Sequence, residues 1–209
     1  MATARTALKA EFSCVACGCS ECRPETFAGG RVAYCKSCGL GRRMEQGAVG
    51  GAHADDSHLA AGSTSDRDKR WAAALLAALR VDEPVLDVGR GGGPLLSVVA
   101  AGGSKGIEGD DALAVGLRDR SVAVISKSLF DEDVGRSQAG QFGAITAIRS
   151  LECERDLRGA IVRAFELLKP DGVLLFEMAL AARKYRDVSR YPAAQAFFPT
   201  VRSIEMLFS

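Results

Sequence analysis

Two pairs of cysteines near the N-terminus have the spacing of a metal site. Cys14 and Cys17 form one C-x2-C pair, and Cys35 and Cys38 form another. Each pair can make a compact turn that points both sulfur atoms at one ion, and four thiolates complete the tetrahedral shell of Zn²⁺. Because such a shell leaves no open position, the ion has a structural rather than a catalytic role. The sequence therefore predicts one Zn²⁺ held by these four cysteines.

Two more cysteines leave alternatives at this site. Cys19 and Cys22 extend the first pair to C-x2-C-x-C-x2-C, which offers other ligand sets or a two-metal cluster. Reduced thiols without metal, or a redox dithiol, are further alternatives. Structural disulfides are rare where thiols are kept reduced, and the first residues contain no apolar stretch long enough for a signal peptide. We therefore expect a cytoplasmic protein whose cysteines bind metal.

A glycine-rich turn suggests a second chemistry. Residues 85–93 read Val-Leu-Asp-Val-Gly-Arg-Gly-Gly-Gly, with Gly89, Gly91 and Gly93 at alternate positions after an apolar strand. Glycine permits a tight turn and lets the backbone approach a ligand closely. Pro94 suits the first turn of a following helix, where its missing N–H is not needed. The pattern predicts that a cofactor lies against this backbone.

An acidic residue at the end of the next predicted strand belongs to the same candidate site. Glu108 comes twenty-one positions after Asp87. A carboxylate at this place in an α/β unit can accept hydrogen bonds from both hydroxyls of a ribose. We therefore expect a nucleoside-containing cofactor with its ribose at Glu108.

The elements that position these residues alternate along the chain. Strands are predicted at 84–89, 105–108, 122–125, 142–148 and 173–178, and helices at 66–80, 94–101, 111–119 and 154–168. Pro170 cannot continue the last helix, and Asp171-Gly172 suits a turn into the last strand. Strands that alternate with helices predict parallel crossover units in an α/β fold.

Composition divides the chain into three parts. Residues 12–43 are rich in Cys and Gly and form the predicted zinc ribbon. Residues 44–65 are dominated by Gly, Ala, Ser and Asp and are predicted to be a linker. Residues 66–209 form the predicted cofactor-binding domain.

The glycine turn and the segments around it resemble class I S-adenosylmethionine (SAM)-dependent methyltransferases. The first motif of that family has the form V-L-D-x-G-x-G-x-G, which residues 85–93 match, and its second strand ends in an acid, as at Glu108. Residues 142–153 continue the resemblance, and Leu-Leu-Lys-Pro-Asp-Gly at 167–172 is similar to the L-L-K-P-G-G of the family. The resemblance covers roughly residues 66–178. It implies a Rossmann-like, doubly wound, mostly parallel sheet that binds S-adenosyl-L-methionine.

Carried over by position, the resemblance assigns residues to the methionine end of SAM. Asp87 would orient that end, directly or through water. Gly89, Gly91 and Gly93 would leave room for the cofactor beside the backbone.

The same resemblance assigns residues to the adenosine end. Glu108 would bind the ribose, while Ser128 and Leu129, after the third strand, would flank the adenine. No catalytic residue is assigned, because methyl transfer depends mainly on holding the nucleophile and the cofactor in line.

A zinc ribbon before such a domain also resembles a methyltransferase subgroup, some of whose members modify sugars in secondary metabolism. The implied function is SAM-dependent methylation of a small molecule, such as a sugar or a secondary metabolite. Two alternatives are an inactive SAM-binding accessory or interaction protein and a zinc-ribbon RNA methyltransferase.

The charge balance gives little support to other partners. Lys and Arg number 27 and Asp and Glu number 26, so the whole chain offers no electrostatic argument for nucleic acid or a membrane. No segment approaches the roughly 20 apolar residues of a membrane-spanning helix. A small basic cluster around the ribbon is more typical of a solvated face. Neither a nucleic-acid nor a membrane partner is expected.

The last predicted strand is expected to have an open edge. The sequence supplies no clear counterpart of the final antiparallel strand pair that relatives lay beside it, so this pair is predicted to be missing. An exposed apolar edge templates pairing with another chain. Either the residues after Met178 fold back over this edge, or a second copy or a protein partner pairs with it, and we expect a homo-oligomer or a protein partner.

Overall fold

The computed structural model describes residues 12–27, 30–44, 70–71, 74–75, 77–78, 83–89, 96, 103–109, 114–115, 118, 123–126, 128–181 and 195–209. These residues belong to two compact units. Unit 1 contains the described residues up to 44 together with 152–158, 178–181 and 195–209, and unit 2 contains the others. In the described part of the chain, no helix is long and apolar enough to cross a membrane.

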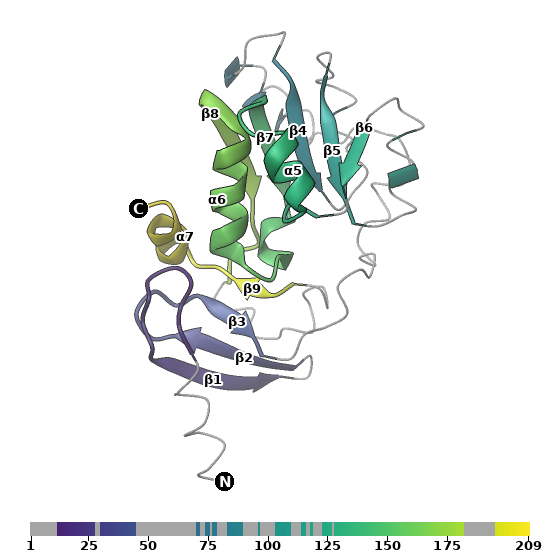
Figure 1. The fold of residues 1–209 in the computed structure, drawn as a ribbon. Coiled ribbons are helices and arrows are strands. Elements are labelled where there is room, and N and C mark those ends of the chain that lie inside the picture. The colour runs from purple at the N-terminus through teal and green to yellow at the C-terminus, as the bar shows by residue number, and fades with distance from the viewer. Residues whose placement is uncertain are drawn as a thin grey trace. The chain divides into compact units, whose positions relative to one another are not determined.

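Unit 1 contains a four-stranded antiparallel sheet in the order β1-β2-β3-β9 (Figure 1). The strands are β1 (Cys22–Phe27), β2 (Gly30–Cys35), β3 (Gly41–Arg43) and β9 (Phe197–Phe198). The first three come from the predicted ribbon, but β9 comes from the far end of the chain. It pairs with β3 through Gly41 and Phe198, where a Cβ on Gly41 would lie 3.1 Å from that of Phe198. Residues near the C-terminus therefore complete the ribbon sheet.

The helix α7 (Val201–Leu207) follows β9 after a short connection. Thr200 is its N-cap, because the Thr200 hydroxyl accepts a hydrogen bond from Ser203 N at 3.1 Å. Ser203 Oγ accepts in return from Thr200 N at 2.9 Å, which completes a capping box. This reciprocal pair satisfies two backbone donors that a helix start otherwise leaves without partners.

Unit 2 is built on a five-stranded sheet in the order β6-β5-β4-β7-β8, in which all neighbouring pairs are parallel (Figure 1). The strands are β4 (Val85–Gly89), β5 (Lys105–Glu108), β6 (Ala123–Ser126), β7 (Phe142–Ile148) and β8 (Leu168–Glu177). Central strand β4 is buried over its first four residues. The predicted α/β, Rossmann-like fold with an additional N-terminal ribbon is therefore confirmed.

Helices and short turns connect these strands. They include α5 (Glu132–Ser137), the 3-10 helix η2 (Leu151–Cys153) and α6 (Leu157–Leu167). Asp131 caps α5 by accepting a hydrogen bond from Asp133 N at 3.0 Å. One core cluster of unit 2 joins Leu75, Val85, Leu96 and Ala144. These are the apolar positions that the sequence pattern assigned to a helix, a strand, a helix and a strand.

The largest difference from the predicted elements lies at the start of β8. The strand was expected to begin at 173 but begins at Leu168. Phe142 pairs with Leu168 and Ala144 with Val173, so the intervening residues of β8 bulge out of the ladder. Asp171 takes the left-handed conformation there, with φ of 64°. The expected turn therefore exists, but as an interruption within the strand.

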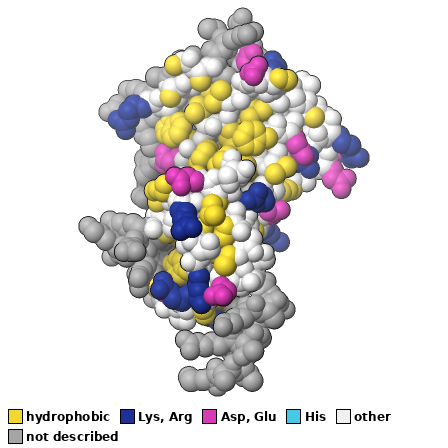
Figure 2. All heavy atoms as spheres, turned by 90° about the vertical axis from the view of Figure 1, so that its left-hand side faces the viewer, with side chains coloured by type: hydrophobic (Ala, Val, Ile, Leu, Met, Phe, Trp, Pro, Cys, Tyr) yellow, Lys and Arg dark blue, Asp and Glu magenta, His cyan; other side chains and the backbone are white. Residues whose placement is uncertain are grey.

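Strand β8 forms one margin of the sheet in the described structure, where its paired neighbour is β7. No described strand pairs antiparallel with this sheet, and residues 182–194, which follow β8, lie outside the described part of the chain, so the missing strand pair stays a prediction. On α6, Val162 and Phe165 are exposed, with half of each residue accessible to solvent (50% and 52%). Hydrophobic side chains gather in the upper half of the face in Figure 2, on the side of the molecule that carries α6 and β8.

Candidate functional site

The two C-x2-C pairs fold into turns of the same kind. In each turn, the second cysteine is followed by a glycine with a positive φ, 71° at Gly18 and 78° at Gly39. The glycine N–H donates to the carbonyl of the first cysteine, at 2.8 Å to Cys14 O and at 3.0 Å to Cys35 O. Glycine adopts this conformation at no steric cost. The sequence shows the same Cys-Gly step in both pairs, at Cys17-Gly18 and at Cys38-Gly39.

The turns bring four thiols together. The Sγ atoms of Cys14, Cys17, Cys35 and Cys38 all lie within 4.8 Å of one another. Two of these separations, Cys14 to Cys38 and Cys17 to Cys35, are 3.5 Å. A zinc ion with Zn–S bonds of about 2.3 Å requires sulfur atoms about 3.8 Å apart. The cluster therefore fits a tetrahedral ion.

Burial and hydrogen bonding set the protonation of this cluster. Burial raises the pKa of Cys17, but hydrogen bonds from the Cys19 backbone and the Cys35 thiol outweigh it, so that the pKa falls to about 7. Burial raises the pKa of Cys38 well above its ordinary value, and its neighbour Cys14 raises it further. Four adjacent thiolates therefore need a cation between them, and metal binding to such a site releases protons.

The two additional ribbon cysteines lie elsewhere. Cys19 Sγ accepts a hydrogen bond from Glu21 N at 3.4 Å. Cys22 begins β1 and is paired in register with Cys35. Neither belongs to the group of four thiols, and the seven cysteines form no disulfide.

The second candidate site lies at the carboxyl ends of parallel strands in unit 2. Asp87 on β4 is largely buried, with 8% of the residue exposed, and it is the register partner of Thr146 on β7. The Thr146 hydroxyl donates a hydrogen bond to the Asp87 carboxylate. Burial raises the pKa of Asp87 to about 6, and this hydrogen bond opposes the rise. The arrangement is a buried carboxyl group that can ionise near neutral pH.

Glu108 and Gly89 are brought side by side. They are register partners at the ends of β5 and β4, and Glu108 is 1% exposed. In open α/β sheets, ligands bind outside the carboxyl ends of the strands. The structure therefore places the predicted ribose acid next to the first glycine of the predicted turn. Gly91 and Gly93 lie outside the described residues.

The segment after β6 carries the last two predicted cofactor residues. Ser128 is exposed, and its loop is held by Ser126, whose Oγ accepts from Ser128 N at 3.1 Å and donates to Asp131 at 3.0 Å. Ser128 Oγ accepts from Phe130 N at 3.1 Å. Leu129 is fully buried. Of the two, Ser128 is thus the residue whose side chain is open to a ligand.

Two polar residues near β4 were not predicted. Thr146 is fully buried, and Ser150, which is 3% exposed, donates from Oγ to Val88 O at 2.7 Å. The signal in the sequence was a threonine inside the otherwise apolar run of residues 142–148. A polar group in a buried strand needs a hydrogen-bond partner, which here is Asp87.

Residues 63–207 match the model of a family described as methyltransferase domain. The chain belongs to this methyltransferase family. The match covers both the glycine turn and the buried acids at the strand ends. It supports the resemblance to SAM-dependent methyltransferases on which the sequence prediction rested. No protein in a comparison with curated proteins matches the chain.

Solved structures show the same fold in proteins of low sequence identity. A SAM-dependent methyltransferase from Thermotoga maritima matches with a TM-score of 0.52 and 17% identity over 68% of this chain and 74% of its own. Coclaurine N-methyltransferase, bound to N-methylheliamine and S-adenosylhomocysteine (SAH), matches with a TM-score of 0.51 and 17% identity over 67% of this chain.

A third match is a chain from a Haloferax volcanii complex of the Trm112 methyltransferase activator with a methyltransferase. It superimposes on this chain with a TM-score of 0.55 and 16% identity, over 74% of each chain. By contrast, the match with coclaurine N-methyltransferase covers only 46% of that enzyme's chain. At these identities, the likeness to the three structures extends to the fold alone.

Proposed function

We propose that this chain is a SAM-dependent methyltransferase that acts on a small molecule, such as a sugar or a secondary metabolite, and carries one structural zinc ion. Membership of the methyltransferase family supports the reaction class. The observation that carries the proposal is the position of Glu108 beside Gly89 at the carboxyl ends of two parallel strands.

The buried acids suit the two polar ends of SAM. Bound SAM supplies a methyl group activated by a positively charged sulfur. The ionised carboxylate of Asp87 would attract the ammonium group at the methionine end, directly or through water. Glu108 would accept hydrogen bonds from the ribose hydroxyls, and the loop at Ser128 and Leu129 would border the adenine. These contacts would fix the cofactor so that the methyl carbon faces the nucleophile of the substrate.

The four-thiol cluster suits structural zinc. Its cysteines would fill all four positions of a tetrahedral Zn²⁺, which leaves none for a substrate. Both turns are closed by backbone hydrogen bonds of 2.8 Å and 3.0 Å, so the ligand geometry is already formed. The zinc would thus stabilise unit 1 rather than take part in methyl transfer.

An RNA substrate has less support, because basic residues around the ribbon are engaged within the protein. Lys36 pairs with Glu21 at 2.8 Å. Arg43 donates from Nε to Gln195 O at 2.9 Å and lies over the Phe198 ring at 5.5 Å from its centroid. Charges held in this way are less available for phosphate contacts, which supply most non-specific nucleic-acid affinity.

Calorimetric titration with SAM and SAH tests the proposal. Glu108→Ala should weaken SAM binding by about 1–3 kcal/mol, the usual cost of leaving such polar groups without partners. Glu132→Ala is the matched control, because Glu132 is an exposed acid on α5. Unchanged affinity in Glu108→Ala would remove Glu108 from the site, and absence of SAM binding to the wild type would overturn the proposal.

Methyl transfer itself needs a separate measurement. Incubation with methyl-labelled SAM and a panel of amino sugars, hydroxylated metabolites and RNA would identify the substrate class. Binding of SAM without transfer to any of them would favour the inactive accessory protein.

A further inference from the structure

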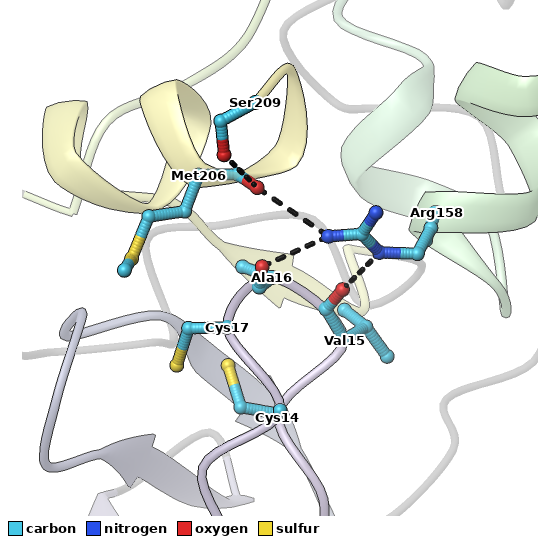
Figure 3. A pocket seen from close by; sticks show the side chains of 8 residues that line it. Cys14, Val15, Ala16, Cys17, Arg158, Met206 and Ser209 are labelled. Atoms are coloured by element: carbon cyan, nitrogen blue, oxygen red, sulfur yellow. Dashed lines mark hydrogen bonds between the residues drawn. The ribbon is translucent and has the colours of Figure 1, made fainter.

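The first cysteine turn is held by an arginine from much later in the chain. Arg158, in the first turn of α6, donates from Nε to Val15 O at 2.7 Å and from Nη2 to Ala16 O at 2.9 Å. These carbonyls lie between Cys14 and Cys17, and Figure 3 shows the guanidinium directed at both of them. The side chain therefore fixes the backbone between the two ligands of this turn.

The same guanidinium reaches the C-terminal helix. Nη2 of Arg158 also donates to Met206 O near the end of α7, at 3.4 Å (Figure 3). All three acceptors are backbone carbonyls, and within the described structure Arg158 forms no ion pair with a carboxylate. A planar guanidinium presents its donors as a rigid fork, which a lysine cannot reproduce. One side chain thus ties the first turn to α7.

The second cysteine turn is held at the other end of α7. The N-cap hydroxyl of Thr200 donates to Cys38 O at 2.7 Å. Close packing accompanies this bond, because a Cβ on Gly39 would lie 3.2 Å from Thr200 Cγ2. The helix therefore contacts one metal-binding turn through its N-cap and is linked to the other through Met206.

The segment before α7 is attached to the ribbon as well. Arg43 N, in β3, donates to Ala196 O at 2.8 Å, and Ala196 N donates to Glu152 O at 2.9 Å. Glu152, which is 1% exposed, accepts from Ala179 N through Oε1 at 3.2 Å. Residues 195–209 are thus bonded to a ribbon strand as well as to both cysteine turns.

We propose that Arg158 and Thr200 are positioning residues for the zinc ligands, so that metal binding and ordering of residues 195–209 are linked. This inference rests on the proposed zinc site. Each ligand pair can meet the ion only while the backbone of its turn is fixed, and these two side chains bond to that backbone. Conversely, a bound ion keeps the carbonyl acceptors in place for α7, because metal binding free energy contributes to folding in such sites.

Zinc affinity, measured by competition with a chromogenic chelator, tests the positioning roles. Arg158→Ala and Thr200→Val should each weaken zinc binding by about 10–100-fold, the usual effect of removing a group that orients metal ligands. Thr200→Ser keeps the hydroxyl and should retain wild-type affinity, while Arg158→Lys should lie between Ala and wild type.

Two variants serve as controls. Arg155→Ala removes an exposed positive charge three residues earlier. Ser203→Ala removes half of the capping box but leaves the Thr200 bond to Cys38 O. Arg155→Ala should bind zinc like the wild type, and Ser203→Ala should lose less affinity than Thr200→Val, because it weakens the start of α7 but keeps the bond to Cys38 O. Wild-type affinity in Arg158→Ala and Thr200→Val would overturn the inference, whereas absence of zinc in the wild-type protein would overturn the proposed zinc site instead.

Hydrogen exchange of the wild-type protein tests the linkage without any substitution. Chelation of the metal should raise exchange of the amides of Ala196, Ser203 and Ile204, which donate hydrogen bonds in this segment. Amides of unit 2 such as Gly143 N, which donates to Pro84 O at 3.0 Å, should keep their protection. Protection of residues 196–208 that does not change on chelation would overturn the linkage.

Discussion

The hydroxyl of Thr146 donates a hydrogen bond to the carboxylate of Asp87 inside the parallel sheet. This pair joins β7 to β4, directly before the glycine turn. Burial raises the pKa of Asp87 to about 6, although the hydrogen bond acts in the opposite direction. A group that changes its charge just below neutral pH thus lies where the methionine end of SAM is proposed to bind.

SAM affinity should therefore rise with pH between 5 and 7. At pH 5, one unit below a pKa of about 6, only about a tenth of Asp87 is ionised, so binding should be roughly tenfold weaker than above pH 7. Calorimetric titration across this range measures the effect. Asp87→Asn should bind SAM weakly with a flat profile, and a wild-type profile that is equally flat would contradict the role of Asp87.

The Thr146 hydrogen bond supplies a control for this profile. Thr146→Val removes the bond that lowers the pKa of Asp87, so the midpoint should move to higher pH. Thr146→Ser keeps a hydroxyl and should leave the midpoint unchanged. A midpoint that does not respond to Thr146→Val would assign the titration to another group.

The same pKa shift predicts how the ligand-free protein responds to pH. Because the pKa of Asp87 is raised from 3.8 to about 6 by folding, the folded state binds more protons in that window. The free energy of unfolding should then fall as pH rises from about 4 to 6, by about 2–3 kcal/mol at most. Asp87→Asn should remove this contribution. The free energy of unfolding of the variant minus that of the wild type should therefore increase as pH rises from 4.5 to 7. Denaturant unfolding at pH 4.5 and 7 checks the sign.

Metal analysis should find one zinc ion per chain. Four sulfur atoms within 4.8 Å of one another satisfy one ion, while Cys19 and Cys22 lie outside that group. Replacing Cys35 and Cys38 together by Ser should abolish binding, whereas Cys19→Ser with Cys22→Ala should retain it. Two ions per chain, or zinc retained without Cys35 and Cys38, would show that the ligand set is wrong.

Local pattern was sufficient to predict the sheet of unit 2. The strands at 105–108 and 142–148 are found at the predicted residues. Residues 142–148 form a nearly continuous apolar run, which is a local signal for a buried strand, whereas residues 105–108 were predicted from the alternation of strands and helices along the chain. The structure pairs Gly89 with Glu108, two residues that the sequence analysis had assigned to one candidate site, because parallel strands align their carboxyl ends. The glycines at 91 and 93 and the linker lie outside the described residues, so the full turn and the domain boundaries stay predictions.

Contacts between distant parts of the chain could not be predicted in this way. The dipeptide of β9 is too short to carry a strand signal, and its partner β3 lies more than 150 residues earlier. Nothing in the periodicity of α6 distinguishes Arg158 from Arg155 or Arg163. What distinguishes Arg158 is the geometry of Val15 and Ala16, which exists only in the folded unit.

The margin of the parallel sheet supports a last prediction, that the purified chain associates through β8. Its residues from Val173 to Glu177 are only partly buried, and the described strand after it, β9, pairs in the other sheet. The described neighbour of β8 is β7, and the other edge of an apolar strand can template pairing with another chain. Light scattering over a wide concentration range should therefore show a mass that increases with concentration.

The exposed apolar side chains of α6 offer a different explanation of such association, and one variant separates the two. Val162→Gln with Phe165→Gln changes residues that are 50% and 52% exposed, so the core and the strand edge should be preserved. Association that persists in this variant assigns the contact to β8, while its loss would assign the contact to α6 and contradict the prediction. A wild-type protein that stays monomeric at all concentrations and binds no dye specific for exposed apolar surface would also contradict it, because the edge of β8 would then be covered within the chain.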